Sequence, residues 1–361
     1  MSRAIDVLHL LGTAQQEGSG IARIVASLAK ELDPQKYRVH AWFLQSDGPL
    51  VSDLNNAGAS ARCVLWRSGS RDPLGAWRFW RQLRSEDFAI VHQHWGARSI
   101  RQLIRLGSNA KIIVHSHGQT HANEKDNLDP VAVRGADTII AVSRSVARQF
   151  SDRKVYVIYS GIQASDRVAE DRSDTRKHTI VIGTACRLVE AKGVRDLVLA
   201  FAALSKRVPQ LRLEIAGSGP EEKSLFEVAQ ANGIAESVRL LGWRDDLRCL
   251  LRTWDIFVLA SHDEGFGIAV LEAMMEGLPV VATNVGGLAE LVDNQRTGYL
   301  VEPEDVDGLH KALLSLVDDR EARIRLGAAG RRRAESDFAV GKMVAGIESV
   351  YDALTSKVAR P

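Results

Sequence analysis

The chain has 361 residues, of which 45% are hydrophobic and 25% are charged, and its formal net charge is +2. This composition excludes a disordered or fibrous protein and suits two globular domains of ordinary size. No stretch approaches the roughly 18 uninterrupted apolar residues of a membrane-spanning helix, and no secretory signal is recognisable. Cys63, Cys186 and Cys249 are far apart and indicate thiols of a reducing compartment, so we expect a cytoplasmic protein.

Short β-rich apolar runs alternate with helical stretches through the first part of the chain. Strands are expected at 4–11, 37–44, 88–94, 111–117 and 138–143, and a helix at 21–32 follows a Gly-containing loop after the first strand. Strand–helix alternation predicts a parallel sheet built from right-handed crossovers. We therefore expect residues 1–162 to form an N-terminal Rossmann-like domain.

The alternation restarts after a change in composition. Residues 163–178 are charged, poor in large apolar residues and without period, which is typical of a linker. Strands are then expected at 179–185, 211–217, 237–242, 255–261, 279–283 and 298–301, with helical segments between them. A second Rossmann-like domain is predicted at 179–337. The fold class is therefore α/β, with two parallel sheets facing a central cleft.

The loop "CRLVEAKG" follows the first strand of the second domain and carries two cations. In open α/β sheets, ligands bind beyond the carboxyl ends of the strands. Arg187 offers a fork of donors to phosphate oxygens, while Lys192 supplies a compact positive charge just before Gly193 and a helix. A solvated surface loop would have the same composition, so Arg187 and Lys192 indicate a phosphate-binding site only in combination with the neighbouring motifs.

The stretch "EGFGIAVLE" places Glu264 and Glu272 around a Gly-Phe-Gly and the start of an apolar helix. Gly265 and Gly267 permit close approach of the backbone to a ligand, and the free N–H groups of a helix start attract anions. Two interpretations of Glu272 are open. It faces solvent at the helix edge, or it accepts hydrogen bonds from ligand hydroxyls.

The spacing of the two glutamates resembles the E-x7-E motif of retaining enzymes with the GT-B fold, in glycosyltransferase family 4. "CRLVEAKGV", "LEIAGSGPEE", "VRLLGW" and the run 255–292 are similar to family segments in the same order. The resemblance covers essentially the whole chain and is most specific over 183–302. It implies a hexosyltransferase that uses a nucleotide-diphosphate sugar, UDP- or GDP-linked, in bacterial exopolysaccharide or lipopolysaccharide assembly.

The same resemblance implies a ligand for each domain. The domain at 1–162 binds a glycan or lipid-linked acceptor, and the domain at 179–337 binds the nucleotide sugar. The C-terminal helix, within 338–361, crosses back toward the first domain. Two alternatives stay open: a GT-B-fold nucleotide-sugar epimerase, and a catalytically inactive partner subunit.

The resemblance also implies a role for individual residues. Glu264 binds hydroxyls of the donor sugar, Glu272 binds the ribose hydroxyls, and His117 faces the donor sugar from the first domain. The candidate catalytic residues are His117, Arg187, Lys192 and Glu264. The candidate donor-binding residues are Gly18, Gly20, Arg187, Lys192, Trp243, Arg244, Glu264, Gly265, Phe266, Gly267, Ile268 and Glu272. Among these, Trp243 and Arg244 lie beside the base.

We expect neither a metal nor another cofactor. No DxD-like acidic pair is placed to hold a metal on the diphosphate, so fixed cations and helix N-termini stabilise the developing charge. No residue is an obvious covalent nucleophile, and we expect same-face attack with the leaving phosphate accepting the proton of the acceptor. His92, His94, His115 and His117 alternate and could share one face as metal ligands, but we favour His117 in the site and interpret His92 and His94 as structural.

A basic, Trp-rich stretch is the remaining feature. Residues 62–111 hold the whole basic excess of the first 160 residues, and 73–85 predict an amphipathic helix with Trp77 and Trp80. Arg98, Arg101 and Arg105 are spaced to share a face of the next helix. Such helices suit the headgroup region of an anionic membrane, so we expect 73–105 to dock peripherally at the inner face of the cell membrane. Core tryptophans with a solvated arginine face are the alternative.

Three other classes of protein are disfavoured. A nicotinamide-dependent enzyme needs G-x-G-x-x-G after the first strand, whereas Arg23 follows Gly18 and Gly20 here. A P-loop nucleotidase needs G-K-[ST], which is missing from the sequence. No RNA- or DNA-binding module is recognisable, so no nucleic-acid partner is expected.

Overall fold

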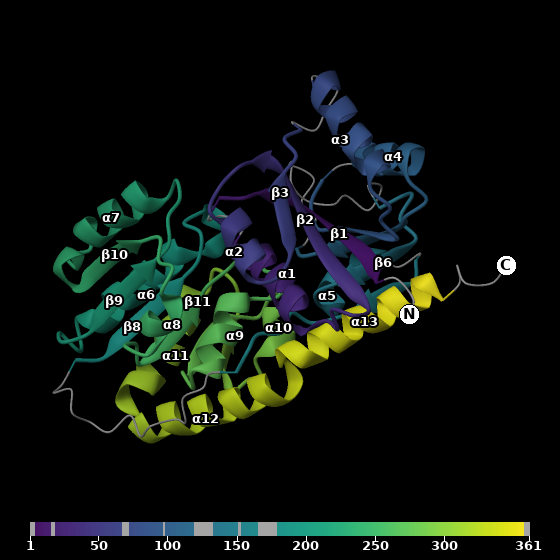
Figure 1. The fold of residues 1–361 in the computed structure, drawn as a ribbon. Helices are drawn as coiled ribbons and strands as arrows, with labels where there is room; N and C mark the ends of the chain where they lie inside the picture. Colours follow the sequence, from purple (N-terminus) through teal and green to yellow (C-terminus); the bar gives the residue numbers. More distant parts are fainter. Residues whose placement is uncertain are drawn as a thin grey trace. The chain divides into compact units, whose positions relative to one another are not determined.

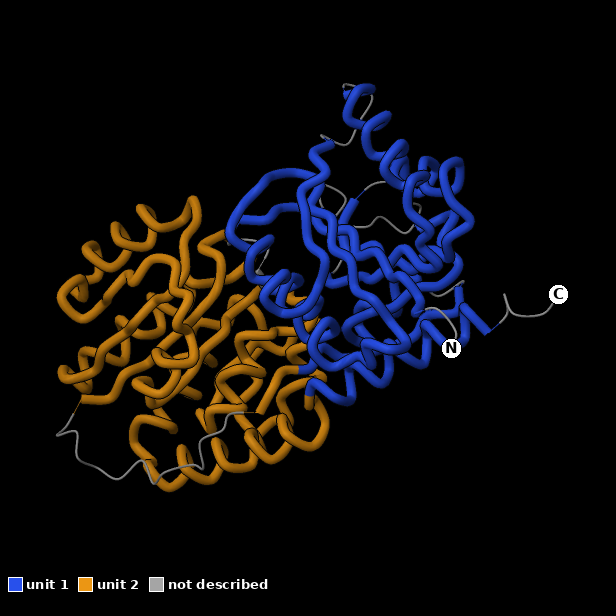
Figure 2. Tube along the Cα trace, viewed as in Figure 1, with its two compact units in different colours: residues 1–161, 340–361 blue, residues 162–339 orange. Residues whose placement is uncertain are grey.

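The computed structural model describes residues 4–15, 19–66, 72–96, 98–118, 133–150, 153–164 and 179–356. Its elements are labelled in Figure 1, where each sheet is covered by helices. The chain divides into two compact units, residues 1–161 with 340–361 and residues 162–339 (Figure 2). The linker predicted at 163–178 falls mostly on residues outside the described ranges.

The described part of unit 1 contains a seven-stranded parallel sheet in the order β3-β2-β1-β4-β5-β6-β7. Its strands are β1 Ile5–Thr13, β2 Tyr37–Ser46, β3 Ser60–Cys63, β4 Ile90–Gln93, β5 Lys111–Ser116, β6 Thr138–Ala141 and β7 Val155–Val157. Its helices are α1 Ser19–Glu31, α2 Leu50–Asn56, α3 Pro73–Ser85, α4 Arg98–Gly107, α5 Arg144–Ala147 and α13 Val340–Thr355. The chain reverses its direction of strand addition between β1 and β4, which is a topological switch point.

Unit 2 contains a six-stranded parallel sheet in the order β10-β9-β8-β11-β12-β13. Its strands are β8 Val181–Ala185, β9 Arg212–Ala216, β10 Val238–Gly242, β11 Ile256–Leu259, β12 Val280–Thr283 and β13 Gly298–Val301. Its helices are α6 Val194–Ser205, α7 Glu222–Ala231, α8 Leu247–Leu251, α9 Ile268–Met275, α10 Leu288–Leu291, α11 Val306–Asp318 and α12 Arg320–Asp337. Here the switch point lies between β8 and β11.

The two cores follow from helices packing on sheets. In unit 1 the apolar side chains of β1, β2 and β4 meet α3 and α4, and Trp42 packs edge-on against Phe79. In unit 2 the core joins β8 and β9 to α6 and α11. Central strands such as β4, β11 and β12 are buried at every position, because a parallel sheet covered on both faces needs no polar alternation.

The C-terminal helix α13 belongs to unit 1, as the sequence predicted. Its Tyr351 is fully buried, and Lys36 forms ion pairs with Glu348 at 3.0 Å and with Asp352 at 2.8 Å. The α/β fold class with two parallel sheets is confirmed. Among the described helices, none is long and apolar enough to cross a membrane.

The predicted basic surface is only partly present. α3 exposes Leu74 and Trp77, which are 60% and 50% exposed. In α4, however, Arg101 is 1% exposed and donates a hydrogen bond to Gln93 Oε1 at 2.9 Å. The prediction that Arg101 shares a solvent-facing basic surface with its neighbours is therefore wrong. A long side chain with a buried hydrogen-bonding partner can enter the core, which charge spacing alone does not reveal.

Candidate functional site

The switch point of unit 2 brings two functional loops together. β8 pairs with β11 through Ile182 and Ile256, so the loops leaving their carboxyl ends start side by side. The first loop carries Arg187 and Lys192, and the second carries Glu264. In sheets of this kind, ligands bind in the crevice at this position.

An ion pair joins the two loops. Lys192 Nζ lies 2.8 Å from Glu264 Oε2, and the two side chains are only 22% and 18% exposed. Burial alone would lower the pKa of Lys192, but attraction to Glu264 and the hydrogen bond between them outweigh it and raise that pKa. Lys192 is thus charged at neutral pH. The pair holds a cation and a carboxylate together at the place where a charged ligand would bind.

Arg187 lies in the same loop but is exposed, and its guanidinium makes no ion pair or hydrogen bond with any residue of the described ranges. The loop around it is rigid. Leu188 donates its N–H to Ser218 O at 2.9 Å, and Glu221 donates to Leu188 O at 3.0 Å. A loop that is held by backbone hydrogen bonds and carries a guanidinium without a partner among the described residues is suited to binding an anion.

Glycines allow the loops to pack against each other. Gly286 has φ +48°, and a Cβ there would lie 1.8 Å from the carbonyl oxygen of Glu264. Gly193 has φ +57°, and a Cβ there would lie 2.0 Å from the carbonyl oxygen of Ala260. Only glycine fits such close backbone contacts at positive φ. The position of Glu264 therefore depends on the backbone at "NVGG" as well as on its own loop.

Helix α9 begins directly after Gly267, whose φ is +95°. Glu272 on this helix is only 7% exposed, so the interpretation that it faces solvent is wrong. Glu276, one turn on, pairs with Arg252 at 3.0 Å, and this cation offsets the repulsion between the two acids. Glu272 is thus a buried carboxylate on a helix whose free N–H groups point toward the end that carries Glu264.

The turn after β10 holds Trp243 and Arg244. Trp243 Nε1 donates to Asp245 Oδ1 at 2.8 Å, and Arg244 makes a two-pronged pair with Asp246 at 2.7 and 2.8 Å. Both side chains are therefore engaged in hydrogen bonds to acidic residues of the same turn. Any contact that this turn makes with a base therefore falls chiefly to its backbone.

A second pair braces the two loops of the switch point and was not anticipated from the sequence. His262 Nε2 lies 2.7 Å from Asp196 Oδ2 on α6, and His262 N–H donates to Ala191 O at 2.8 Å. The only sequence signal was a histidine two residues before Glu264, which by itself indicates no role. The structure shows instead that His262 positions the backbone that carries Glu264.

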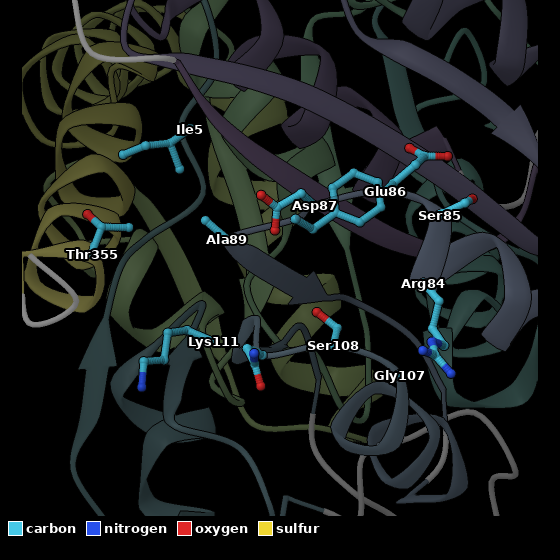
Figure 3. Close-up of a pocket in the computed structure, with 12 residues that line it drawn as sticks. Ile5, Arg84, Ser85, Glu86, Asp87, Ala89, Gly107, Ser108, Lys111 and Thr355 are labelled. Carbon is cyan, nitrogen blue, oxygen red and sulfur yellow. The ribbon is translucent and has the colours of Figure 1, made fainter.

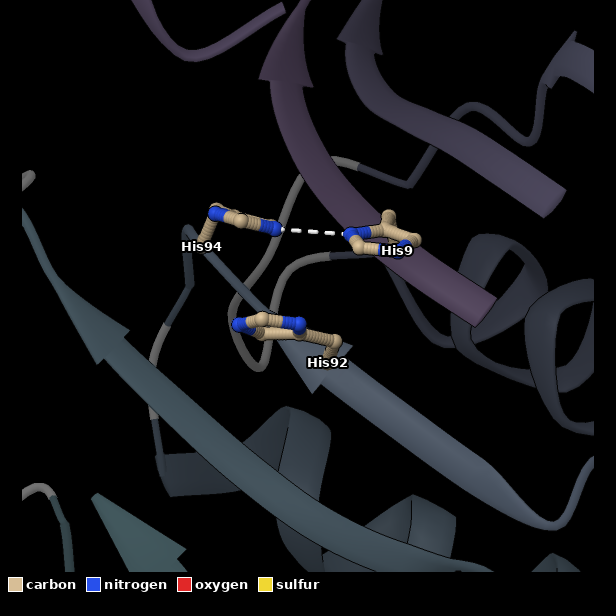
Figure 4. Close-up of side chains that lie close together, drawn as sticks. All are labelled: His9, His92 and His94. Carbon is tan, nitrogen blue, oxygen red and sulfur yellow. Dashed lines mark hydrogen bonds between the residues drawn. The ribbon is translucent and has the colours of Figure 1, made fainter. Parts of the chain in front are cut away.

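Unit 1 gathers five histidines at its own switch point. His117 Nε2 lies 2.9 Å from His94 Nδ1, whose ring also contacts His9 on β1 at 2.9 Å. His92 and His115 complete the group, and Figure 4 shows His9, His92 and His94. Burial lowers the pKa of His9 and of His117 to about 3, and it lowers the pKa of the other three well below the usual value. All five rings are neutral at pH 7.

Two triads in this group are close enough to be considered as metal ligands. They are His9, His92 and His94, and His94, His115 and His117, whose nitrogens lie within 4.8 Å of one another. Neutral imidazole is the form that binds a metal.

A pocket of about 690 Å³ lies at the opposite edge of the unit 1 sheet (Figure 3). Ile5, Ala89 and Lys111, which line it, precede or begin β1, β4 and β5. This is the amino-terminal edge of a parallel sheet, where ligands of open α/β folds do not bind. Its volume therefore does not make it the functional site.

Comparison with known proteins agrees with this geometry. Residues 18–166 match the model of "Glycosyltransferase Family 4", and residues 166–333 match that of "Glycosyl transferases group 1". The chain belongs to glycosyltransferase family 4. Its two Rossmann-like units are those of the GT-B fold.

Several relatives of this family 4 member are known. Glycogen synthase of Mycobacterium tuberculosis is 34% identical over 229 residues, 61% of this chain and 55% of that protein. Lipopolysaccharide core biosynthesis glycosyltransferase LpsE of Rhizobium meliloti is 32% identical over 211 residues, 57% of this chain and 61% of that protein. The chain thus spans little more than half the length of these relatives. Anabaena Alr3699/HepE, solved with UDP and glucose, has a TM-score of 0.80 at 21% identity, over 97% of this chain and 100% of that one.

The structure of the family 4 chain groups most of the predicted residues within unit 2. Arg187, Lys192, Glu264 and the start of α9 surround one switch point, and Trp243 follows β10, which is separated from β8 by β9, at its carboxyl end. The segment Gly265–Ile268 connects Glu264 to α9. His117 and Gly20 belong to unit 1, with Gly20 in the first turn of α1, and Gly18 lies outside the described residues.

Proposed function

We propose that this protein is a retaining glycosyltransferase that moves a hexose from a nucleotide-diphosphate sugar to a glycan or lipid-linked acceptor. The observation that carries the proposal is the Lys192–Glu264 pair, 2.8 Å apart at the switch point between β8 and β11. A cation for a diphosphate and a carboxylate for sugar hydroxyls lie side by side there. The UDP and glucose in the similar Anabaena structure support a donor of this class.

In the proposed reaction the nucleoside diphosphate leaves with growing negative charge. Arg187, Lys192 and the N–H groups at the start of α9 stabilise that charge in a preorganised way, without a metal on the diphosphate. Glu264 accepts hydrogen bonds from the sugar, and Glu272 accepts them from the ribose. The acceptor hydroxyl attacks on the same face that the diphosphate leaves, and the leaving phosphate takes its proton.

The remaining predicted residues complete the proposed donor site. The backbone around Trp243 and Arg244 contacts the base, and the backbone of Gly265, Phe266, Gly267 and Ile268 approaches the sugar and the diphosphate. His117 contacts the donor sugar from unit 1, where Gly18 and Gly20 also let the first loop approach. The name of the LpsE relative supports a role in bacterial lipopolysaccharide or exopolysaccharide assembly.

Nucleotide binding tests the proposal directly. Thermal unfolding is measured with UDP, GDP, ADP and their common hexose conjugates, on the wild type and on Glu272→Ala. A nucleotide at 100 times its Kd adds about 2.7 kcal/mol of stability when it binds only the folded protein. We expect one nucleotide to raise the melting temperature of the wild type, and most of that shift to disappear in Glu272→Ala.

Glu276→Ala is the matched control, because it removes a carboxylate from the same helix that already pairs with Arg252. This variant should melt at a lower temperature and still respond to the nucleotide. Stabilisation by NAD or by lipid, with none from the nucleotide panel, would sink the transferase proposal. Product analysis by NMR then distinguishes retention from inversion at the anomeric carbon.

We also propose that α3 docks on an anionic membrane surface at the inner face of the cell membrane. Leu74 and Trp77 are exposed, and Arg81 lies 5.4 Å over the ring of Trp77, so apolar and cationic groups share one helix. An aromatic ring beside a guanidinium suits the headgroup region. A lipid-linked acceptor would explain why this unit approaches the membrane.

Vesicle sedimentation tests the membrane surface. Wild-type protein should bind vesicles that contain phosphatidylglycerol more tightly than neutral phosphatidylcholine vesicles. Trp77→Ala should weaken this binding about tenfold, since it removes most of the apolar area that α3 would bury in the membrane. Phe226→Ala, which removes an exposed aromatic ring from α7 of unit 2, should bind like the wild type. Equal binding by all three proteins would exclude α3 as the docking helix.

A further inference from the structure

The five histidines of unit 1 form two layers of hydrogen-bonded rings. The first layer is a row of three, with His117 Nε2 2.9 Å from His94 Nδ1, and His94 Nε2 2.9 Å from His9 Nδ1. The second layer is a row of two, with His92 Nε2 3.1 Å from His115 Nδ1. The layers lie face to face. His92 stacks on His94 with 4.4 Å between ring centroids, and His115 stacks on His117 at 4.2 Å.

This stacking does not suit a shared metal ion. The lone pair of an imidazole nitrogen lies in the plane of its ring. The planes of His92 and His94 differ by only 19°, and those of His115 and His117 differ by 26°. Each candidate triad takes rings from both layers, so its lone pairs cannot converge on one point without rotating a ring. The nitrogens that face one another are instead already joined by hydrogen bonds.

Tyr351 of α13 connects the two layers at one end. Its hydroxyl oxygen lies 2.6 Å from His92 Nδ1 and 3.4 Å from His9 Nε2. Tyrosine and the five histidines thus form one continuous chain, from His117 through His94, His9, Tyr351 and His92 to His115. Tyr351 is fully buried, and the C-terminal helix supplies it from a distant part of the sequence.

This chain of hydrogen bonds has a direction, because each group donates to the next. A neutral imidazole has one N–H and one lone pair, so the proton position on one ring dictates the position on the next. The 2.6 Å contact is in the range of an O–H donor and shorter than an ordinary N–H···O bond, which favours Tyr351 as the donor to His92 Nδ1. The phenol oxygen then accepts from His9 Nε2–H.

The donor in the Tyr351–His92 hydrogen bond determines which nitrogen carries the proton on each of the other rings. His9 Nδ1 accepts from His94 Nε2–H, and His94 Nδ1 accepts from His117 Nε2–H. On the other branch His92 Nε2–H donates to His115 Nδ1. The chain then ends on His115 Nε2–H, a buried atom without a hydrogen-bond partner in the described part of the structure.

We propose that Tyr351, His9 and His94 act as positioning residues that hold His117 in its Nε2–H tautomer, which leaves Nδ1 unprotonated. His117 Nδ1 then accepts a hydrogen bond from a ligand hydroxyl and donates none. The identity of that hydroxyl, on the donor sugar, rests on the proposed function. The tautomer itself does not, because it follows from the chain within unit 1.

Nitrogen NMR of the histidine rings tests this tautomer. The protein is labelled with ¹⁵N-histidine, and the His117 signals are identified by their loss in His117→Gln. We expect the wild type to show Nε2 protonated and Nδ1 unprotonated. In Tyr351→Phe the group that orients the chain is gone, and His117 should populate both tautomers. Tyr37→Phe is the matched control, because Tyr37 packs against Tyr351 but lies outside the chain, and it should keep the wild-type tautomer.

Three outcomes would overturn the proposal: an Nδ1–H tautomer in the wild type, an unchanged tautomer in Tyr351→Phe, or a stoichiometric transition metal in the purified protein by mass spectrometry. Activity is measured separately. If the protein transfers sugar, Tyr351→Phe should lower kcat/KM for the donor about five- to tenfold, the effect of weakening one hydrogen bond. If NMR shows the Nε2–H tautomer of His117 but the protein binds no nucleotide sugar, the proposed hydrogen-bond chain is supported and the proposed function is refuted.

Discussion

Lowering the pH from 7 to 5 is expected to cost about 2 kcal/mol of unfolding free energy for each histidine that stays neutral in the folded protein. Burial lowers the pKa of His9 and of His117 to about 3, and the pKa values of His92, His94 and His115 are also well below normal. For His9 and His117 together this loss is about 4 kcal/mol, a large part of the stability of a typical domain.

The sign follows from proton binding. The unfolded chain binds a proton on His9 and on His117 below about pH 6.5, whereas in the folded protein these two rings bind none until about pH 3. This contribution to stability is therefore intact above pH 6.5 and is lost progressively as the pH falls toward 3. Unit 1 should lose stability as the pH falls from 6.5 to 5, because these histidines must enter the core uncharged.

Urea unfolding at pH 5, 6, 7 and 8, followed by tryptophan fluorescence, measures this effect. The slope of the logarithm of the unfolding constant against pH reports the number of protons taken up. His9→Asn should lower the slope between pH 5 and 6 by about one proton, whatever its effect on stability at pH 7. Stability that does not change between pH 5 and pH 7 would show that these rings are not kept neutral.

Replacing Lys192 by alanine is expected to lower kcat by about 10²- to 10³-fold, the usual loss when one preorganised stabilising group is removed from a reacting centre. In the proposed reaction Lys192 contributes in two ways. Its charge opposes the charge that develops on the diphosphate, and its ion pair at 2.8 Å holds Glu264 in place. Single-turnover rates with the donor identified by thermal shift give the measurement.

Two further variants separate these contributions. Lys206→Ala removes an exposed lysine at the end of α6 and should retain wild-type activity. Combining Lys192→Ala with Glu264→Gln closes a double-mutant cycle, and losses smaller than additive would show that the two residues act as a pair. Wild-type kcat in Lys192→Ala, with an intact fold, would assign the ion pair a purely structural role.

Helices and strands with a strong local pattern were predictable. β8, β11 and β12 are continuous apolar runs, and helices such as α6 and α11 carry their apolar periodicity within their own sequence. The edge strands β3 and β7 were not predicted. "SARC" has no apolar pattern, and "VYV", although it is made of strand-forming residues, is only three residues long.

Burial of individual polar residues was beyond sequence reasoning. Glu272 and Arg101 are charged residues on helices, and spacing alone left Glu272 ambiguous and placed Arg101 at the surface. Each is buried in the structure, at 7% and 1% exposure. A charge can be buried only where another part of the chain supplies a partner, as Gln93 does for Arg101. Such partners are known only once the elements are packed.

The sequence by itself determined the α/β class, the two successive sheets and the loops that carry Arg187, Lys192 and Glu264, because alternation, glycines and charges at strand ends are local features. The tertiary structure alone decided the Lys192–Glu264 pair and the histidine chain. Both depend on strand order, since β8 lies beside β11 and β1 beside β4 although neither pair is consecutive in sequence. Tyr351 reaches His92 only because α13 packs on unit 1. Contacts between distant residues arise from packing the whole chain, and no short stretch of sequence encodes them.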